Sequence, residues 1–276
     1  MKPIKKIIGA VGIMSLCFLT NAKAATLTDA EYAKLKNVFT DARISTMTDE
    51  EAQRYLSYNL ENAETVSKYY KVTETANGTT SVEVSQEEAE NAFDSVQNPS
   101  TRASYHETAY KNIRITTSLM SGSRYFVSLI NRWLVTPNKK SYDVIAMRTD
   151  DAQVEDGTQH GAQTYWAASI GTYNTVNYSA NGTNINKQSN GYGISMNLVD
   201  DASYFECDTD AMITATTKYA EVFGTYQHAT KNVTLAQSKA YIISHNGYGK
   251  VLNFTTSVVD YYDGMQGVSI ALPYNG

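Results

Sequence analysis

The spacing of apolar residues changes once along this chain, and the change falls at Gln97–Ser100. Before this point apolar side chains recur every three or four residues, which is the period of an α-helix. After it they recur at every second residue, which is the period of a β-strand. Pro99 lies between the two patterns, where a helix is expected to stop. The sequence therefore predicts a helical region with a hairpin at 25–99 and a β domain at 100–276.

Three helix starts in the first region are marked by a hydroxyl residue with glutamate three positions later. In such a capping box the hydroxyl accepts a free backbone N–H, and the acid reaches back to the cap residue. After the second box the helical spacing continues through Val66 and Tyr69, so we expect that helical face to extend this far. Asn77-Gly78, between alternating Val and Thr residues, predicts a β-hairpin before the third helix. The boxes are Thr28/Glu31, Thr48/Glu51 and Ser85/Glu88.

Runs of alternating Thr, Tyr and Val residues with Gly and Asn turns fill the second region. Parallel strands need crossovers of a dozen or more residues, usually helical, and no such pattern separates these runs. We therefore expect a mainly β protein with a small α/β N-terminal part. Its architecture is predicted to be an antiparallel β-sandwich, jelly-roll-like, with Trp133 in the core. The runs are 113–119, 125–135, 142–147, 192–198, 213–219, 252–258 and 268–272.

Residues 1–24 have the three parts of an export signal. Lys2, Lys5 and Lys6 precede an apolar stretch, and Ala22-Lys23-Ala24 is a small-residue cleavage pattern. The apolar stretch is shorter than the roughly 20 residues that span a bilayer, so a stable membrane span is not expected. We predict cleavage between Ala24 and Ala25. The chain would then be a secreted bacterial protein, released or held loosely at the cell surface.

Removal of the leader leaves 252 of the 276 residues and changes the formal charge from −5 to −9, because four lysines and no acids leave. An acidic chain without a basic run repels phosphate backbones, so nucleic acid is not an expected partner. Cys17 leaves with the leader, and Cys207 is then the only cysteine. An internal disulfide is excluded, and stability must come mostly from core burial.

The familiar local motifs of catalysis are absent. His106-Glu107 starts like a zinc-protease motif, but Tyr110 stands where the second histidine belongs. Cys207 has acidic neighbours that disfavour a thiolate, and His228 is the nearest histidine downstream. Asp143 on an apolar strand is the most noticeable single acid. We accordingly predict no catalytic, cofactor-binding or metal-binding residue.

Two groups of acidic residues could serve as ligands for a calcium ion. Hard oxygen ligands on loops suit the weak calcium sites of extracellular modules, although no EF-hand spacing occurs. Solvated loop acids are the simpler interpretation. The two acidic groups are Asp150, Asp151, Glu155 and Asp156, and Asp200, Asp201, Asp208 and Asp210.

Two further features bear on function. Between Gly157 and Val199 the only formal charge is Lys187, and few charges with alternation are what a membrane-inserting hairpin needs. The chain also has 21 tyrosines, and Trp166 beside Tyr165 could stack on sugar rings. Aromatic residues are common in strands, so packing also explains them.

The run from Trp133 to Ala146, with Pro137 and Ser141-Tyr142-Asp143, resembles a block W-x-x-x-P-x-x-x-S-[YF]-D followed by apolar residues. It is similar to that of uncharacterised exported proteins of Gram-positive bacteria, and the resemblance covers residues 108–150 best. No established activity accompanies that group, so the resemblance implies no site residues.

Three functions remain open from the sequence. The first is a secreted, non-enzymatic binding or structural protein of the cell surface, with a cell-wall or glycan partner. The second is a secreted hydrolase that acts on glycan or wall polymer through dispersed carboxylates. The third is a pore-forming protein. The absence of local catalytic motifs favours the first.

Overall fold

The computed structural model describes residues 24–75, 78–97, 108–244, 250–264 and 266–274. These ranges leave out the leader up to Lys23 and Asn77 of the predicted turn. They also leave out His106, Glu107 and His245.

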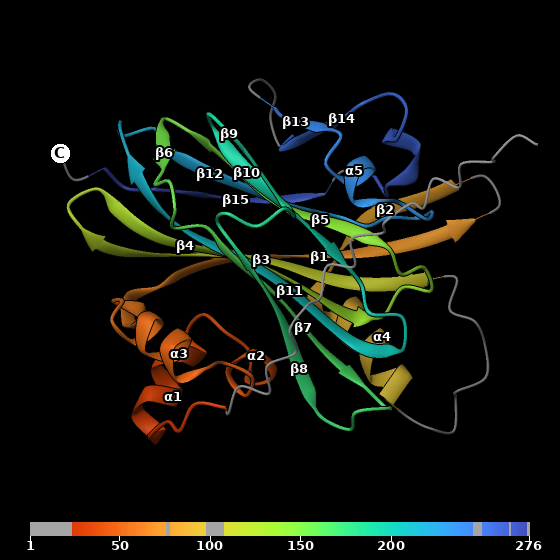
Figure 1. The fold of residues 1–276 in the computed structure, drawn as a ribbon, viewed down its shortest axis with the longest axis horizontal. Coiled ribbons are helices and arrows are strands. Elements are labelled where there is room, and N and C mark those ends of the chain that lie inside the picture. Colours follow the sequence, from red (N-terminus) through yellow and green to blue (C-terminus); the bar gives the residue numbers. More distant parts are fainter. Residues whose placement is uncertain (1–23, 76–77, 98–107, 245–249, 265, 275–276) are drawn as a thin grey trace, which may run out of the picture.

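Two antiparallel sheets face each other and form a β-sandwich (Figure 1). The larger sheet has the order β2-β1-β3-β4-β11-β7-β8, and β6 also pairs with β11. The smaller has the order β15-β12-β5-β10-β9. The predicted class, mainly β with antiparallel pairing, is confirmed. The strands of the larger sheet are β1 (Glu64–Thr75), β2 (Gly78–Val84), β3 (Thr108–Ser121), β4 (Arg124–Val135), β6 (Ala152–Val154), β7 (His160–Ala167), β8 (Tyr173–Ser179) and β11 (Ala202–Ala215); those of the smaller are β5 (Tyr142–Asp150), β9 (Ile185–Gln188), β10 (Gly191–Asn197), β12 (Glu221–Gln227) and β15 (Gly267–Ala271).

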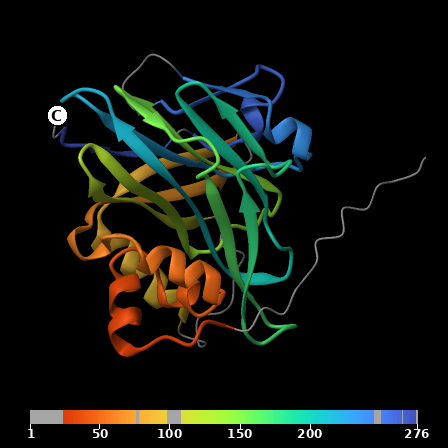
Figure 2. The ribbon, with the colours of Figure 1, turned by 60° about the vertical axis from the view of Figure 1, so that its left-hand side comes forward.

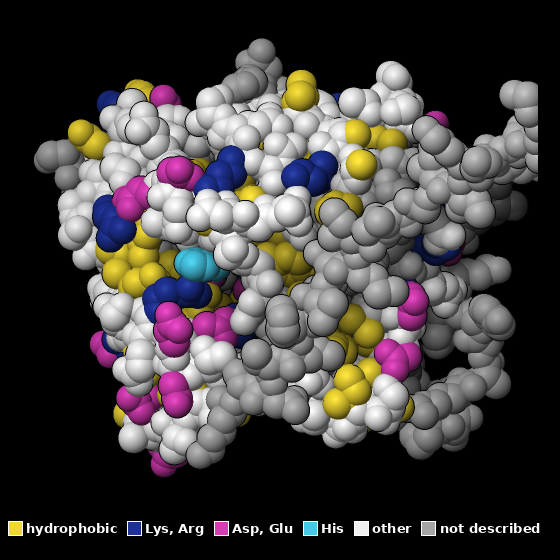
Figure 3. Space-filling view, in the orientation of Figure 1, with side chains coloured by type: hydrophobic (Ala, Val, Ile, Leu, Met, Phe, Trp, Pro, Cys, Tyr) yellow, Lys and Arg dark blue, Asp and Glu magenta, His cyan; other side chains and the backbone are white. Residues whose placement is uncertain are grey.

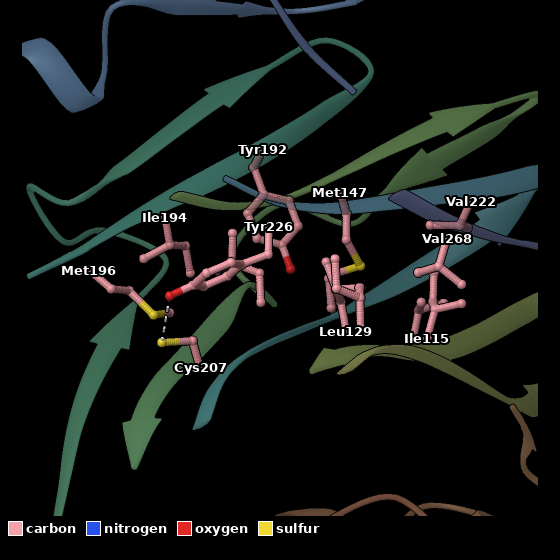
Figure 4. Close-up of a cluster of buried hydrophobic side chains, with 14 of the residues drawn as sticks. Ile115, Leu129, Met147, Tyr192, Ile194, Met196, Cys207, Val222, Tyr226 and Val268 are labelled. Carbon is pink, nitrogen blue, oxygen red and sulfur yellow. Dashed lines mark hydrogen bonds between the residues drawn. The ribbon is translucent and has the colours of Figure 1, made fainter. Parts of the chain in front are cut away.

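The main hydrophobic core lies between the two sheets (Figure 4). Trp133 is 2% exposed there, as predicted. β4 is buried on both faces because its other face is covered by helices, and this explains why its sequence is apolar at nearly every position. The labelled core side chains come from both sheets: Ile115, Leu129 and Cys207 from the larger, and Met147, Tyr192, Ile194, Met196, Val222, Tyr226 and Val268 from the smaller.

A helical module, residues 25–63, covers the outer face of the larger sheet (Figures 1 and 2). The capping boxes of Thr28 and Thr48 are both formed, which confirms these two helix starts. The module buries its own apolar residues against Phe126, Ile130 and Met212 of the sheet. Its elements are α1 (Asp29–Lys36), α2 (Asp41–Ile44), α3 (Asp49–Leu56) and the 3-10 helix η1 (Leu60–Asn62).

Two smaller coverings complete the fold. Helix α4 (Gln86–Gln97) follows the hairpin, and the Ser85 hydroxyl accepts the Glu88 N–H at 3.1 Å, as its capping pattern predicts. The outer face of the smaller sheet carries a third apolar cluster. Its added elements are α5 (Leu235–Ser238), β13 (Tyr241–Ile243), β14 (Leu252–Phe254) and η3 (Val259–Tyr261).

The structure corrects three boundaries. Val66 and Tyr69 belong to β1, because residues 64–73 pair with β3 over ten positions and this pairing overrides the helical spacing. β11 ends at Ala215, and Thr217 and Tyr219 lie in a turn. β14 ends at Phe254, and the chain turns after it.

The nearly uncharged segment 157–199 forms β7, β8, β9 and β10. Most side chains of β7 and β10 are buried, in different sheets of the sandwich. Burial in the core therefore accounts for much of the low charge of this segment.

Candidate functional site

A pocket of about 570 Å³ opens between the helical module and the β7–β8 hairpin. His160 pairs with Ser179, and Gly161 with Tyr178, so these four residues meet at one end of the hairpin. Figure 3 shows basic and acidic side chains around a histidine on the face above the helical module. We call this hollow the α3 pocket. It is lined by Arg43, Thr48, Glu50, Glu51, Arg54, Tyr55, His160, Gly161, Asn177, Tyr178 and Ser179.

Arg43 on α2 is a buried residue of this lining, with 1% of its surface exposed. Its Nη2 donates to Glu51 Oε1 at 2.9 Å, and its Nε lies 3.2 Å from Asp208 Oδ2. Within the described part of the chain, Nη1 has no hydrogen-bond partner. Buried donors are usually paired. Arg43 thus contributes an unpaired N–H group to the lining of the α3 pocket.

A second arginine is held over a buried tyrosine. The Arg54 guanidinium lies 4.5 Å from the centre of the Tyr55 ring, and its Nη2 donates to the Tyr55 hydroxyl at 2.6 Å. That hydroxyl donates to Asp210 Oδ2 at 2.7 Å. The Arg54 Nε is buried and has no partner among the described residues. The α3 pocket thus has two arginines with unused N–H groups.

Below the pocket, β11 turns three buried carboxyl groups toward the helical module. Burial raises the pKa of Asp208 to about 8, which the charge of Arg43 opposes and those of Glu206 and Asp210 reinforce. Burial also raises the pKa of Asp210 to about 6, against the opposing charge of Arg54. The sequence placed these acids on a loop, and this was wrong. They alternate with core residues on a central strand, because the helical module covers the strand's outer face.

The third carboxyl group, Glu206, fastens the module to the sheet. It accepts the hydroxyl of Thr40 at 2.9 Å and that of Tyr204 at 3.0 Å. Its pKa is raised by burial. Thr40 also caps α2 by accepting the Arg43 N–H, so the position of Arg43 depends on this contact.

His160 is the titratable group on the hairpin side of the pocket. Burial, together with the nearby charge of Arg54, lowers its pKa to about 4. The imidazole is therefore neutral at pH 7 and can donate or accept a hydrogen bond. Arg43 and Arg54 are matched by Glu50 and Glu51, so the charges of the lining residues balance.

A second hollow, of about 760 Å³, lies beside the edge strand β15. Tyr70 on β1 bridges to this strand, since its hydroxyl donates to the Gly267 carbonyl at 2.7 Å. The ion pair of Lys68 and Glu83 at the rim is 2.9 Å long and solvated. Of the side-chain polar atoms lining it, Gln266 Oε1 is buried without a partner. No buried unpaired cation lies there among the described residues.

Asp143, Cys207 and His228, which the sequence analysis considered as possible reactive residues, lie together in the interior. His228 Nδ1 lies 2.9 Å from Asp143 Oδ2, and Asp143 also accepts the Tyr226 hydroxyl at 2.5 Å. The same hydroxyl lies 3.7 Å from Cys207 Sγ (Figure 4). All four side chains are fully buried, and burial raises the pKa of the Cys207 thiol. A substrate cannot reach this network, which joins the two sheets.

Three of the acids considered for calcium are paired with basic side chains instead. Asp150 pairs with Arg148 at 2.8 Å, and Asp156 pairs with Lys187 at 2.6 Å. Glu155 accepts two hydrogen bonds of 2.7 Å from Arg124. Among the described residues no group of three or more His, Cys, Asp or Glu side chains is placed to hold a metal ion.

The expected aromatic surface is only partly formed. Tyr165 is buried in the core, whereas Trp166 is half-buried and lies across the ladder from Tyr173 and Tyr204. The rings of Tyr173 and Tyr204 meet edge to face, 5.2 Å apart. We call Trp166, Tyr173 and Tyr204 the aromatic patch. It lies at the opposite end of the β7–β8 hairpin from the α3 pocket.

Sequence reasoning missed the α3 pocket. The capping box at Thr48 located α3 and hence Glu51, but nothing local indicated that Arg43 would be buried. The alternation Glu206, Asp208, Asp210 with Cys207 and Thr209 was the available signal. It has the period of a strand, although acids rarely occupy a central one.

Comparison with known proteins adds little to this geometry. No family model and no curated protein sequence matches the chain. One similar solved structure is titled "Complete structure of manganese lipoxygenase of Gaeumannomyces graminis and partial structure of zonadhesin of Komagataella pastoris" (7% identity, TM-score 0.23, 58% of this chain and 67% of that chain). Others are a "Pore forming protein" (9%, 0.24, 60% and 92%) and "Clostridium perfringens delta-toxin" (6%, 0.22, 72% and 91%). At these TM-scores the likeness supports no functional argument. Separately, no helix among the described residues is long and apolar enough to cross a membrane.

Proposed function

We propose that the chain is an exported, non-enzymatic protein that binds a glycan or wall polysaccharide in the α3 pocket. The observation that carries this proposal is the set of unused polar atoms there. Arg43 Nη1 and Arg54 Nε are donors without partners among the described residues, and both arginines line the pocket together with Glu50 and Glu51. A ligand that both donates and accepts hydrogen bonds would pair with the arginines and the glutamates alike.

The charge balance of the pocket favours a neutral ligand over an ionic one. Two arginines face two glutamates, and His160 is neutral at pH 7. A sugar hydroxyl donates one hydrogen bond and accepts others, so it can bridge an arginine and a carboxylate. Hydrogen bonds to charged groups are the stronger kind, worth about 1.5–3 kcal/mol each. A saccharide therefore fits this lining better than an anion or an apolar molecule.

The same geometry disfavours hydrolysis. A glycosidase needs two carboxyl groups on either side of the scissile bond. Asp208 and Asp210 have raised pKa values of about 8 and 6, which acid catalysis could use. Their surfaces are only 1% and 2% exposed, however, because the helical module covers them. We therefore propose binding, and retain hydrolysis as the alternative that the same assay tests.

Export is part of this proposal. The Ala25 N–H donates to the Met47 carbonyl at 2.9 Å, so the fold includes the chain from Ala25 onward. This is compatible with cleavage between Ala24 and Ala25. Sequencing the N-terminus of the protein recovered from culture medium tests it, and an intact leader would contradict it.

Co-sedimentation with insoluble polysaccharides and purified bacterial cell walls tests the binding function. We expect retention on at least one of them. Glu50→Gln should weaken retention by about tenfold or more, the effect of losing one charge-assisted hydrogen bond, and His160→Ala, which removes a neutral hydrogen bond, by about two- to tenfold. Tyr173→Ala in the aromatic patch is the matched control and should bind normally.

Each other outcome contradicts a named part of the proposal. Loss of retention in Tyr173→Ala alone would move the site to the aromatic patch. Failure to bind any polysaccharide would refute the function, and release of reducing ends would replace binding with hydrolysis. Dye release from liposomes by the purified chain would favour pore formation.

A further inference from the structure

Lys111 and Asp263 form an ion pair inside the sandwich. Lys111 is on β3 of the larger sheet, and Asp263 lies between η3 and β15 on the side of the smaller sheet. Lys111 Nζ is 2.7 Å from Asp263 Oδ2, and neither side chain has exposed surface. By comparison, the pair Lys68–Glu83 has a similar length, 2.9 Å, but both side chains are largely in water.

The surroundings of the pair are aromatic. Lys111 Nζ lies 5.3 Å from the ring centre of Trp133 and 5.2 Å from that of Tyr226. Removing two charges from water is costly, and the attraction between them often fails to compensate. A reaction that turned this lysine and carboxylate into one neutral group would remove that cost.

The hydrogen bonds of Asp263 distinguish its two oxygens. Oδ1 accepts the backbone N–H of His228 at 2.8 Å. Oδ2 receives Lys111 Nζ, the Gln266 side-chain amide at 3.2 Å and the Ser81 hydroxyl at 3.4 Å. A fixed N–H is the kind of donor that stabilises a developing oxyanion. Oδ2, next to the amine, is placed to receive protons and leave.

We propose that Lys111 and Asp263 condense to an intramolecular amide bond. Nζ loses a proton to Oδ2 and attacks Cγ, and negative charge develops on Oδ1 against the His228 N–H. The Cγ–Oδ2 bond then breaks, and Oδ2 departs with two protons from the ammonium group as one water molecule. The ammonium and carboxylate thus become an amide and water, with no net proton, oxidant or other reagent required.

Confinement supplies the driving force. Groups held in reacting geometry behave as if at effective concentrations of about 10⁵–10⁸ M, and a dry interior has no bulk water to reverse the reaction. The amide would join residues that are 152 positions apart. It would tie the larger sheet to the segment before β15. With Cys207 the only cysteine in the described chain, and buried, this bond would do what a disulfide cannot do here.

Mass spectrometry of the intact, purified chain tests the proposal. We expect a mass lower than that of the sequence by one water molecule, and, after proteolysis, a branched peptide that contains both Lys111 and Asp263. Lys68 and Glu83 should be recovered in separate linear peptides as the internal control. Lys111→Arg should restore the full mass, because a guanidinium does not condense in this way.

A succinimide at Asp263-Gly264 would also remove one water and is the competing explanation. It would leave Lys111 in a linear peptide and would persist in Lys111→Arg. Either result, or a wild-type chain of full mass, would overturn the proposal. The wild-type measurement decides the matter even if Lys111→Arg does not fold.

Discussion

The buried acid row under the helical module should make this protein less stable as the pH rises through neutrality. Asp208 is the group responsible, since burial raises its pKa from 3.8 to about 8. A carboxyl with a raised pKa keeps its proton in the folded state while the unfolded chain has already lost it. Its contribution is therefore complete at low pH and is lost as the pH rises toward 8. The substitution Asp208→Asn removes this titrating group and therefore tests the prediction.

The size of the expected loss in stability follows from the pH range over which Asp208 is protonated in the folded chain and ionised in the unfolded chain. Between pH 6 and pH 8, one such group changes the unfolding free energy by about 1.4 kcal/mol per pH unit, less near its own pKa. We expect the wild-type chain to lose about 2 kcal/mol, or about 4–8 °C in Tm for a chain of this size. Asp210, with a pKa of about 6, is already about half ionised at pH 6 and adds only a small part of this change. His228 has a raised pKa and acts in the same direction, so a smaller slope remains in the variant.

Urea unfolding at pH 6, 7 and 8 and constant ionic strength measures both chains. Asp208→Asn also deprives Arg43 of a partner 3.2 Å away, so the slope with pH, and not the absolute stability, is compared. His160 opposes this trend between pH 6 and 7, because its pKa is lowered to about 4 and its contribution to stability grows as the unfolded imidazole loses its proton; since both chains contain His160, this effect cancels when their slopes are compared. A wild-type stability that is flat or rises from pH 6 to 8 would refute the reasoning, as would an unchanged slope in Asp208→Asn.

Three smaller predictions concern local structure. Thr48→Ala should lower the unfolding free energy by about 1 kcal/mol through loss of the α3 cap, whereas Thr48→Ser should be near wild type in urea unfolding. Gly224→Ala should cost about 1–3 kcal/mol, because a Cβ there would overlap Leu129 across the core. Gly264→Ala is its control, because a Cβ there would come no closer than 4.0 Å to the Ser81 side chain. Cys207 should not react with a thiol reagent in the native chain and should react fully in urea, and rapid native reaction would contradict its burial.

The class of fold was predictable because it rests on periodicity, which is a local property. The period-2 runs at Ile113 and Tyr125 are long and flanked by clear turns, and they became β3 and β4. The helix prediction was wrong at Val66 and Tyr69, because a short stretch can satisfy both the helical and the strand period. Pairing with β3 decided in favour of the strand. Asp208 and Asp210 were assigned to a loop as possible calcium ligands, whereas the structure places them on β11, under the helical module and near Arg43 and Arg54.

The α3 pocket depends on contacts that no local pattern records. Thr40 and Glu206 are 166 positions apart, yet their hydrogen bond helps to hold α2 on the sheet. Asp143, Cys207 and His228 illustrate the opposite error. Each attracted attention as a reactive residue type, and the fold brings them together, but between two sheets where no substrate enters. The type of a residue indicates which reactions it could take part in, but the tertiary structure decides whether a substrate can reach it.

Two buried contacts between a basic side chain and a carboxyl group, Arg43–Asp208 and Lys111–Asp263, differ in what surrounds them, and this difference assigns them different roles. In the pair Arg43–Asp208, Arg43 lines the α3 pocket and its Nη1 has no partner among the described residues, so an incoming ligand can complete its hydrogen bonds. The pair Lys111–Asp263 is packed against Trp133 and Tyr226 in the interior, and in the proposed amide the two partners would remove each other's buried charge. Cys207 is the only cysteine among the described residues, so no disulfide there joins the two sheets. We therefore expect ligand binding to depend on the first pair and mechanical integrity on the second, and substitutions at Lys111 should leave polysaccharide retention unchanged in any variant that folds.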